Sequence, residues 1–349
     1  MVEKGFVLIL TVFVVTADVR AQDSNDVARD KRLLFKTYWN MPTFQCARYK
    51  LGFEQLAQKY NILQNQNDDF RGDQISLLYD PGVFPAILSS RSGDFYRNGG
   101  VPQEGNLTLH LNTYAEKLDE LIPNKNFSGV GVIDFESWRP IYRQNFGTLT
   151  PYKDLSMKIE KENHPLWTNT QLKAEAARRF EKSGRAFMEQ TLALTKKLRP
   201  NAVWGYYAYP YCFNHKQTDC PPEVVPENDR IKWLFLASNN LHPSIYLYAK
   251  NSATQRMQSI TGRMRESHRI LKTLSDGKRR GVVPYFTLIY PDNNQFLSKD
   301  DINNSIALLK EFRVDGLIIW GSSKHVNTEA KCKDLYTYID TVFGPALNR

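Results

Sequence analysis

The stretch Gly129-Val130-Gly131-Val132-Ile133-Asp134-Phe135-Glu136 decides the predicted fold, because an apolar run ends in two carboxylates. Residues 129–133 are typical of a buried strand. Side chains alternate along a strand, so Asp134 and Glu136 would leave its end on the same side, with their backbones about 6.5 to 7 Å apart. Two acids are therefore expected to meet where a buried strand ends.

A carboxyl pair at a strand end is typical of glycosidases, and mutual repulsion would raise the pKa of one member, leaving a proton donor beside an anion. Two side chains of one strand approach a sugar from one side, whereas a nucleophile and an acid flank it. The pattern therefore favours a substrate that supplies its own nucleophile, the 2-acetamido oxygen of an N-acetylhexosamine. Asp134 would hold the acetamido N–H, and Glu136 would protonate the leaving oxygen. An exposed acid pair without a catalytic role is the alternative that spacing alone leaves open.

Further runs of strand length recur along the chain, at residues 75–79, 130–135, 202–207, 244–248, 282–289 and 316–320. Helical patterns lie between several of them. The clearest covers residues 172–198, where apolar side chains keep helical spacing until Pro200. Strand and helix alternate without a low-complexity linker, which predicts an α/β fold with a parallel sheet closed into a TIM-like barrel, as a single domain.

The expected strand ends are rich in aromatic and acidic side chains. In TIM-like barrels the chemistry lies at the C-terminal ends of the strands. The residues at those ends are Tyr79, Asp80, Asp134, Glu136, Tyr206, Tyr207, Tyr246, Tyr290 and Trp320. Aromatic faces stack on sugar rings, so their coincidence favours a carbohydrate groove, although each aromatic taken alone is more often a core residue.

The N-terminus has the pattern of a secretory signal peptide. Lys4 precedes an apolar stretch, residues 6–15, and Val19-Arg20-Ala21 places small residues at the expected cleavage positions. The segment is too short for a membrane anchor. We expect residues 1–21 to be removed, residues 22–34 to be a disordered or processed segment, and residues 35–349 to form the catalytic barrel of a secreted protein.

The net charge is +9 at pH 7, and loss of residues 1–21 leaves it unchanged because two residues of each sign are lost. A basic secreted protein is predisposed to anionic partners such as acidic polysaccharide, a membrane surface or nucleic acid. A merely soluble basic surface is the alternative on charge alone.

The four cysteines predict two disulfides in an oxidising compartment, with three pairings possible. Cys212 and Cys220 are close enough to close one loop, which leaves Cys46 and Cys332 to join the two ends of the chain. No metal site is expected, because there is no C-x-x-C motif and the six histidines are scattered.

Three glycosylation sequons begin at Asn106, Asn126 and Asn303. They have physical meaning only because the chain is expected to be secreted. We expect all three to lie in surface loops.

Four motifs, in this order, resemble the hyaluronidases of glycoside hydrolase family 56, most closely the insect venom enzymes. They are Asp134-Phe-Glu-Ser-Trp-Arg-Pro140, Trp204-Gly-Tyr-Tyr-Ala-Tyr-Pro-Tyr-Cys212, Pro243-Ser-Ile-Tyr246 and Gly316-Leu-Ile-Ile-Trp-Gly-Ser-Ser323. The resemblance covers about residues 35–348. It implies a distorted barrel of about seven strands that cleaves β-1,4 bonds between N-acetylglucosamine and glucuronate in hyaluronan, with retention through an oxazolinium intermediate. Chondroitin is a further candidate substrate.

The resemblance also implies roles by motif position. Glu136 resembles the general acid that later acts as base, and Asp134 resembles the residue that orients the acetamido group and stabilises its developing positive charge. Tyr207 is similar to a tyrosine that helps to fix this group, Tyr246 to one that borders the scissile bond, and Trp320 to the indole that closes the pocket.

Further residues are expected to bind substrate: Tyr79, Arg139, Arg263, Ser322 and Ser323 by resemblance, and Tyr290 as a strand-end aromatic. For Arg139 and Arg263 the expected role is binding of glucuronate carboxylates or support of the acids, and a structural ion pair is the alternative. The pairing of Cys46 with Cys332 and of Cys212 with Cys220 matches the family's pattern.

Two other functions compete with a hyaluronan hydrolase. One is a chitinase-like hydrolase of uncharged N-acetylglucosamine polymers, which the basic charge and the motifs oppose. The other is a non-catalytic polysaccharide-binding venom or salivary relative, which the intact pair Asp134 and Glu136 opposes. We expect a monomeric enzyme without cofactor, nucleic-acid partner or membrane anchor.

Overall fold

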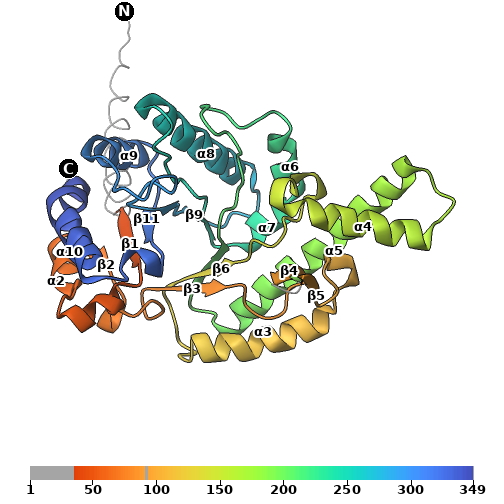
Figure 1. The fold of residues 1–349 in the computed structure, drawn as a ribbon, viewed down its shortest axis with the longest axis horizontal. Helices are drawn as coiled ribbons and strands as arrows, with labels where there is room; N and C mark the ends of the chain where they lie inside the picture. The colour runs from red at the N-terminus through yellow and green to blue at the C-terminus, as the bar shows by residue number, and fades with distance from the viewer. Residues whose placement is uncertain (1–34, 91–92, 349) are drawn as a thin grey trace, which may run out of the picture.

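The computed structural model describes residues 35–90 and 93–348, so the expected signal peptide (1–21) and the expected N-terminal segment (22–34) lie outside the described residues. A ring of parallel strands is surrounded by helices (Figure 1). The parallel strands are β1 (Lys36–Asn40), β2 (Ile62–Leu63), β3 (Ile75–Tyr79), β6 (Val130–Asp134), β7 (Val203–Tyr206), β8 (Asn240–Leu241), β9 (Gly281–Val282), β10 (Tyr285–Phe286) and β11 (Gly316–Trp320).

The ring is assembled from short ladders joined by single bridges. One sheet has the order β10-β11-β1-β2 and another β3-β6-β7, while β8 pairs with β9. Isolated bridges from Tyr207 to His242 and from Ser244 to Tyr285 connect these pieces. With β9 and β10 counted as one interrupted strand, and the two-residue edge strand β2 left out of the count, β1, β3, β6, β7, β8, β9–β10 and β11 make seven. The expected distorted barrel is confirmed.

A side chain closes the ring between β2 and β3. The buried Asn65 side chain donates to the carbonyl of Ile75 at 2.9 Å and accepts from the N–H of Ile75 at 3.0 Å. An amide side chain can replace a strand ladder in this way because it carries both a donor and an acceptor. The barrel is therefore irregular at this edge.

Two of the expected strands are shifted or broken. In the expected strand 244–248, Ser244 makes a single bridge, and the ladder lies earlier, in β8. The expected strand 282–289 is interrupted between β9 and β10, where Pro284 lacks the N–H that a ladder needs. The structure adds β1 and the antiparallel hairpin of β4 (Ala86–Ser90) and β5 (Gly93–Arg97), which the sequence did not predict.

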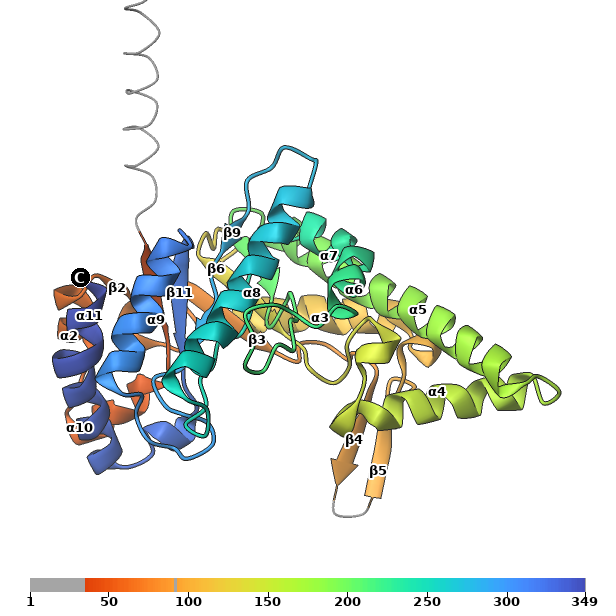
Figure 2. The same cartoon turned by 90° about the horizontal axis from the view of Figure 1, so that it is seen from above.

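The expected helix over residues 172–198 is confirmed as α5. It begins after a capping box, in which Thr168 Oγ1 accepts from the N–H of Gln171 at 3.3 Å and Gln171 Oε1 accepts from the N–H of Thr168 at 2.9 Å. Together with α4, its first half projects away from the barrel (Figure 2). The helices are α2 (Glu54–Lys59), α3 (Leu107–Leu121), α4 (Thr150–Asn163), α5 (Asn169–Leu198), α6 (Val224–Arg230), α7 (Lys232–Ala237), α8 (Ala253–Thr273), α9 (Lys299–Glu311), α10 (Glu329–Tyr338) and α11 (Gly344–Leu347).

Alternation along β6 separates two buried layers. Val130 and Val132 pack inside the barrel with residues of β3, β10 and β11, whereas Ile133 packs outside with residues of α3 and α5. Gly131 faces the ring of Trp204 so closely that a Cβ would lie 2.2 Å from it. The same alternation turns Asp134 toward the barrel axis, at the C-terminal mouth.

Both expected disulfides are present. Cys46 is bonded to Cys332, 286 residues away in sequence, and Cys212 to Cys220, 8 residues away. Within residues 35–90 and 93–348, no helix is long and apolar enough to cross a membrane.

The sequons differ in their surroundings. Asn126 is exposed in the loop before β6, and Asn106 is exposed as the N-cap of α3. Asn303 corrects the expectation of a loop, since it is half-buried within α9 and the hydroxyl residue of its sequon, Ser305, is fully buried. A sequon is a pattern of only three residues, so it does not predict whether the segment that contains it forms a loop or a helix.

Candidate active site

The expected acid pair lies at the C-terminal mouth of the barrel. Asp134 is the last residue of β6, and Glu136 follows it as an exposed side chain at the cavity surface. Asp134 Oδ1 is buried and has no hydrogen-bond partner among the described residues. A buried acceptor without a partner is costly, so this oxygen is suited to bind a donor supplied by a ligand.

The surroundings raise the pKa of both carboxyl groups. For Asp134 the main cause is burial, to which the charges of Glu136 and Asp80 add. Burial also raises the pKa of Glu136, while Arg139 and the hydrogen bond with Asp134 act in the opposite direction. Two carboxyl groups in contact titrate as one pair. The pair therefore retains a proton beyond the pH at which ordinary carboxyl groups lose theirs.

A small pocket of about 170 Å³ encloses the pair with aromatic walls. The rings of Tyr246 and Trp320 are stacked, with centroids 6.0 Å apart and planes 18° apart. The Tyr285 hydroxyl is buried without a partner among the described residues, so the pocket holds an unpaired donor as well as an unpaired acceptor. The pocket is lined by Leu77, Asp134, Glu136, Tyr207, Tyr246, Tyr285 and Trp320.

A large cavity of about 830 Å³ adjoins the small pocket and shares Glu136, Tyr207 and Tyr246 with it. Its only carboxylate among the lining residues is Glu136. The cations and histidine that line it are Arg139, His215, Lys216, Lys250, Arg256 and Arg263. A cavity whose wall has an excess of positive charge favours an anionic ligand.

Tyr207 connects the two spaces. Its hydroxyl is hydrogen-bonded to the side chains of Ser244 and Tyr246, and burial raises its pKa, so it remains a neutral donor. Its ring packs edge-on against Tyr285, with centroids 5.0 Å apart. The structure thus brings together the four residues with expected catalytic roles.

Arg139 is held beside the acids by aromatic rings. Its guanidinium lies 4.7 Å from the ring centroid of Tyr211 and 5.1 Å from that of Phe213. It donates to the carbonyl of Gln144 at 2.6 Å. No carboxylate pairs with it directly among the described residues, so the alternative of a structural ion pair does not apply.

Arg263 reaches the large cavity from α8. Its guanidinium donates to the carbonyl of Ser244 and, at 3.3 Å, to Asn214 Oδ1. In the described part of the chain it has no carboxylate partner, and burial lowers its pKa without removing its charge. Both predicted arginines are therefore cations that face the cavity without an acidic partner.

Tyr79 and Trp320 meet at the rim. Trp320 Nε1 donates to the Tyr79 hydroxyl at 2.7 Å, and the Tyr79 ring, 43% exposed as a residue, stacks on Phe70. Ser322 and Ser323 follow Trp320 but line neither cavity, and Ser323 Oγ accepts from Gln45 Nε2 at 3.0 Å.

Tyr290 is not brought to the site. Its ring is buried in the layer beneath α9, where its hydroxyl donates to Asp301 and accepts from the N–H of Ser298 at 3.1 Å. The chain turns back directly after β10, as the bond from the N–H of Leu297 to the carbonyl of Leu288 shows. This turn carries Tyr290 away from the mouth, so the prediction of a substrate contact is wrong for this residue.

Several residues that line the cavities were not predicted from the sequence, and they include Tyr285, Lys216, Tyr248 and Lys250. Tyr285 lies within an expected strand, and its inward position could have been found from alternation. Tyr248 ends the expected strand 244–248, on the same side as Tyr246, but Lys216 and Lys250 lie in segments without regular periodicity, where sequence gives no direction for the side chain. Among the described residues, no cluster of His, Cys, Asp or Glu could hold a metal ion.

Comparisons with known proteins agree with this geometry. The family model described as hyaluronidase, glycoside hydrolase family 56, matches residues 26–348. The hyaluronidase of Apis mellifera is 45% identical, covering 94% of this chain and 86% of its own length, and hyaluronidase A of Vespula vulgaris is 46% identical, covering 91% and 96%. The crystal structure of bee venom hyaluronidase in complex with a hyaluronic acid tetramer superposes with a TM-score of 0.88 at 46% identity, covering 90% of this chain and 99% of that one. The chain belongs to the hyaluronidase family of glycoside hydrolases.

Proposed function

We propose that this chain is a secreted endo-β-N-acetylhexosaminidase that hydrolyses the β-1,4 bond between N-acetylglucosamine and glucuronate in hyaluronan. The observation that carries the proposal is a same-side acid pair in a small aromatic pocket that opens into a large cationic cavity. The small pocket suits the acetamido group of one sugar, and the cationic cavity suits the carboxylates of the polymer.

Asp134 positions the acetamido group. Its unpaired Oδ1 accepts the acetamido N–H, which turns the acetamido oxygen toward the anomeric carbon. As that oxygen attacks, positive charge develops on the acetamido group, and the Asp134 carboxylate stabilises it at short range. The unpaired Tyr285 hydroxyl is placed to donate to an oxygen of the same sugar.

Glu136 moves the proton. When the acetamido oxygen bonds to the anomeric carbon, the bond to the leaving oxygen breaks, and that oxygen takes its electron pair and the proton of Glu136. The ionised Glu136 then removes a proton from water, the water oxygen bonds to the anomeric carbon, and the oxazolinium ring reopens. Two inversions at one carbon give retention, and Glu136 ends as it began.

The aromatic residues shape the sugar site. Trp320 and Tyr246 form a stacked wall beside the acids, and Tyr207 donates from the boundary between the two spaces. Arg139 and Arg263 bind glucuronate carboxylates in the large cavity, and Tyr79, Ser322 and Ser323 extend the rim. An uncharged chitin chain would leave these cations without partners, which disfavours the chitinase-like alternative.

The same acid pair and cationic cavity suit a second polysaccharide. Chondroitin carries an acetamido sugar and glucuronate as well, so it is a second substrate of the same site.

The proposal also covers the form in which the protein is made. We propose that it is a secreted monomer that loses residues 1–21 and is glycosylated at Asn106, Asn126 and Asn303. Asn303 is the weakest of the three acceptors because Ser305 is buried.

The experiment is depolymerisation of hyaluronan by the purified protein, followed by viscometry, with Glu136→Gln beside the wild type. We expect Glu136→Gln to lower turnover at least about 10²-fold, because it removes the proton donor, and to keep hyaluronan binding by calorimetry. Exposed Glu116 on α3, changed to Gln, is the matched control. Turnover by Glu136→Gln near that of the wild type would sink the assignment. Binding without cleavage by the wild type would favour the non-catalytic alternative.

A further inference from the structure

Part of the large cavity shares no residue with the small pocket. Three of the residues that line only the large cavity are here called the distal wall: Lys216 from the disulfide loop after β7, and Tyr248 and Lys250 from the turn before α8. The catalytic steps proposed above use none of these three residues. All three line the same cavity and two of them are cations, which indicates a second binding region.

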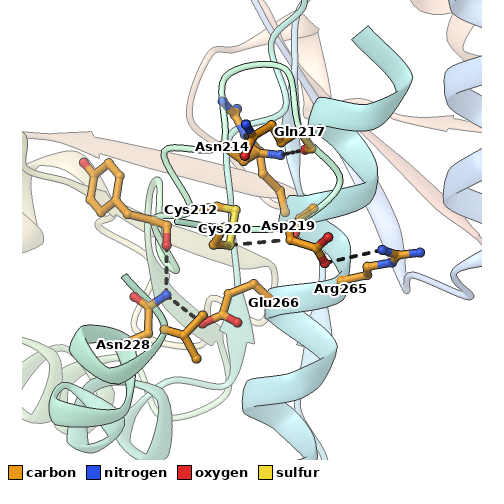
Figure 3. The surroundings of a disulfide bond; sticks show 12 residues. Cys212, Asn214, Gln217, Asp219, Cys220, Asn228, Arg265 and Glu266 are labelled. Atoms are coloured by element: carbon orange, nitrogen blue, oxygen red, sulfur yellow. Dashed lines mark hydrogen bonds and ion pairs between the residues drawn. A yellow bond between two sulfur atoms is a disulfide. The ribbon is translucent and has the colours of Figure 1, made fainter. Parts of the chain in front are cut away.

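The loop that carries Lys216 is fixed at several points. The Cys212–Cys220 disulfide closes it beside α8 (Figure 3). Asn214, which is buried, donates to the carbonyl of Gln217 at 2.6 Å and to that of Ser259 in α8 at 3.0 Å. The backbone on either side of Lys216 is therefore held in place, and a fixed backbone lowers the entropy cost of binding through its side chain.

The turn that carries Lys250 is also fixed. Asp292 accepts from the N–H of Ala249 at 2.8 Å and from the N–H of Lys250 at 2.9 Å. The Lys250 ammonium lies 5.5 Å from the ring centroid of Tyr248, whose residue is 38% exposed. The distal wall thus presents a cation beside an open aromatic face, which suits an acidic sugar that stacks and forms an ion pair.

The two lysines are free cations. In the described part of the chain neither Lys216 nor Lys250 forms an ion pair through its ammonium group, whereas Arg256 on the same cavity is paired with Asp301 at 2.9 Å. Both are exposed, so they carry their charge to the cavity surface. The Asp292 carboxylate lies near Lys250, but it accepts from backbone N–H groups and forms no ion pair with the ammonium group, which is left to bind an anionic group that enters here.

We propose that Lys216, Tyr248 and Lys250 form a second glucuronate subsite, one disaccharide beyond the glucuronate held at Arg139 and Arg263. This inference rests on the proposed function. Hyaluronan carries a carboxylate on every second ring, so a chain whose N-acetylglucosamine occupies the small pocket brings its next carboxylates into the large cavity at regular intervals. A cavity of about 830 Å³ lies near the upper end of the range for small-ligand sites and has room for more than one ring.

The subsite makes binding depend on the length of the substrate. Oligosaccharides that reach the distal wall gain two exposed ion pairs, while shorter ones do not. Because these contacts lie away from the reacting atoms, they act equally on the bound substrate and the transition state, so they lower KM and leave kcat unchanged.

The test is the double variant Lys216→Gln/Lys250→Gln, assayed on even-numbered hyaluronan oligosaccharides of increasing length. We expect KM for the longer members to rise about fivefold, as for the loss of two exposed ion pairs, and KM for the shortest cleaved member to stay within about twofold. The wild-type KM should rise more steeply with salt than that of the variant. Lys173→Gln/Lys182→Gln, on exposed positions of α5, removes the same charge elsewhere and is the control.

Binding separates this inference from the proposed function. Calorimetry measures how Glu136→Gln binds long hyaluronan oligosaccharides and their carboxyl-reduced forms. The same measurements are made on the triple variant that also carries Lys216→Gln and Lys250→Gln. We expect the lysine changes to weaken binding of the native form only. Three results would overturn the second subsite, even if the enzyme cleaves hyaluronan. The lysine changes could weaken binding of the native and the carboxyl-reduced forms equally, raise KM equally for all oligosaccharide lengths, or have no more effect than the α5 control. Failure of the wild type to cleave hyaluronan would contradict the proposed function and leave this binding result to decide the subsite.

Discussion

The small pocket and the large cavity differ in size, charge and hydrogen bonding although they share Glu136, Tyr207 and Tyr246. The small pocket, about 170 Å³, contains two acids, aromatic walls, and the unpaired groups Asp134 Oδ1 and Tyr285 OH. The large cavity, about 830 Å³, has several cations and one carboxylate, Glu136, which belongs to both.

The difference separates two tasks. Desolvation raises the pKa of the acid pair and strengthens its interactions, which suits bond cleavage but leaves little room for a polymer. An open, cationic cavity binds a charged chain over several sugars but would stabilise the ionised form of a nearby acid. Glu136 stands between the two environments, since burial raises its pKa while Arg139 lowers it.

Asp134→Asn should have a large effect on turnover, because in the proposed mechanism it removes the charge that stabilises the oxazolinium ion while it leaves the shape of the pocket intact. We expect kcat to fall about 10²- to 10³-fold, as for loss of one preorganised electrostatic contact, with KM changed little. Steady-state kinetics on hyaluronan measures it. Exposed Asp334 on α10, changed to Asn, is the control, and a change in KM alone would place Asp134 in binding rather than in chemistry.

The pH profile tests the raised pKa of the pair. The proposed mechanism requires one proton on the pair, and burial raises the pKa at which that proton is lost. The rate should therefore persist above the pKa of an ordinary carboxyl group, about 4. It should then fall about tenfold per pH unit once the pH exceeds the raised pKa of the pair. Because Arg139 lowers the pKa of Glu136, Arg139→Gln should move this fall to higher pH. A fall centred near the ordinary carboxyl value would contradict the account.

Arg263→Gln probes the large cavity. Loss of a cation that binds a carboxylate should raise KM about tenfold and leave kcat within about threefold. Arg263→Lys keeps the charge and should recover part of the loss. A fall in kcat without a change in KM would mean that the bond from Arg263 to the carbonyl of Ser244 positions the tyrosines instead.

The parts of the site that the sequence could predict are those set by local geometry. Asp134 and Glu136 follow from alternation along one strand, and the aromatic wall follows from strand ends that meet at one mouth. The positions of Lys216 and Lys250 depend on the conformation of a disulfide-closed loop and of an irregular turn. Neither segment has a periodic sequence pattern from which the direction of a side chain could be predicted. The strand prediction at residues 282–289 treated a run broken by Pro284 as continuous and placed Tyr290 at the mouth.

Tyr290→Phe should have the smallest kinetic effect and thereby define the boundary of both cavities. The Tyr290 hydroxyl bonds to Asp301, and Asp301 pairs with Arg256, which lines the large cavity. Removing the hydroxyl leaves a buried carboxylate with one partner fewer, so the free energy of unfolding should fall by about 1 to 3 kcal/mol. Because Tyr290 lines neither cavity, kcat and KM should stay within about twofold, as measured beside chemical denaturation. A tenfold change in KM at unchanged stability would return Tyr290 to the binding site, and it would show that the large cavity extends beneath Arg256.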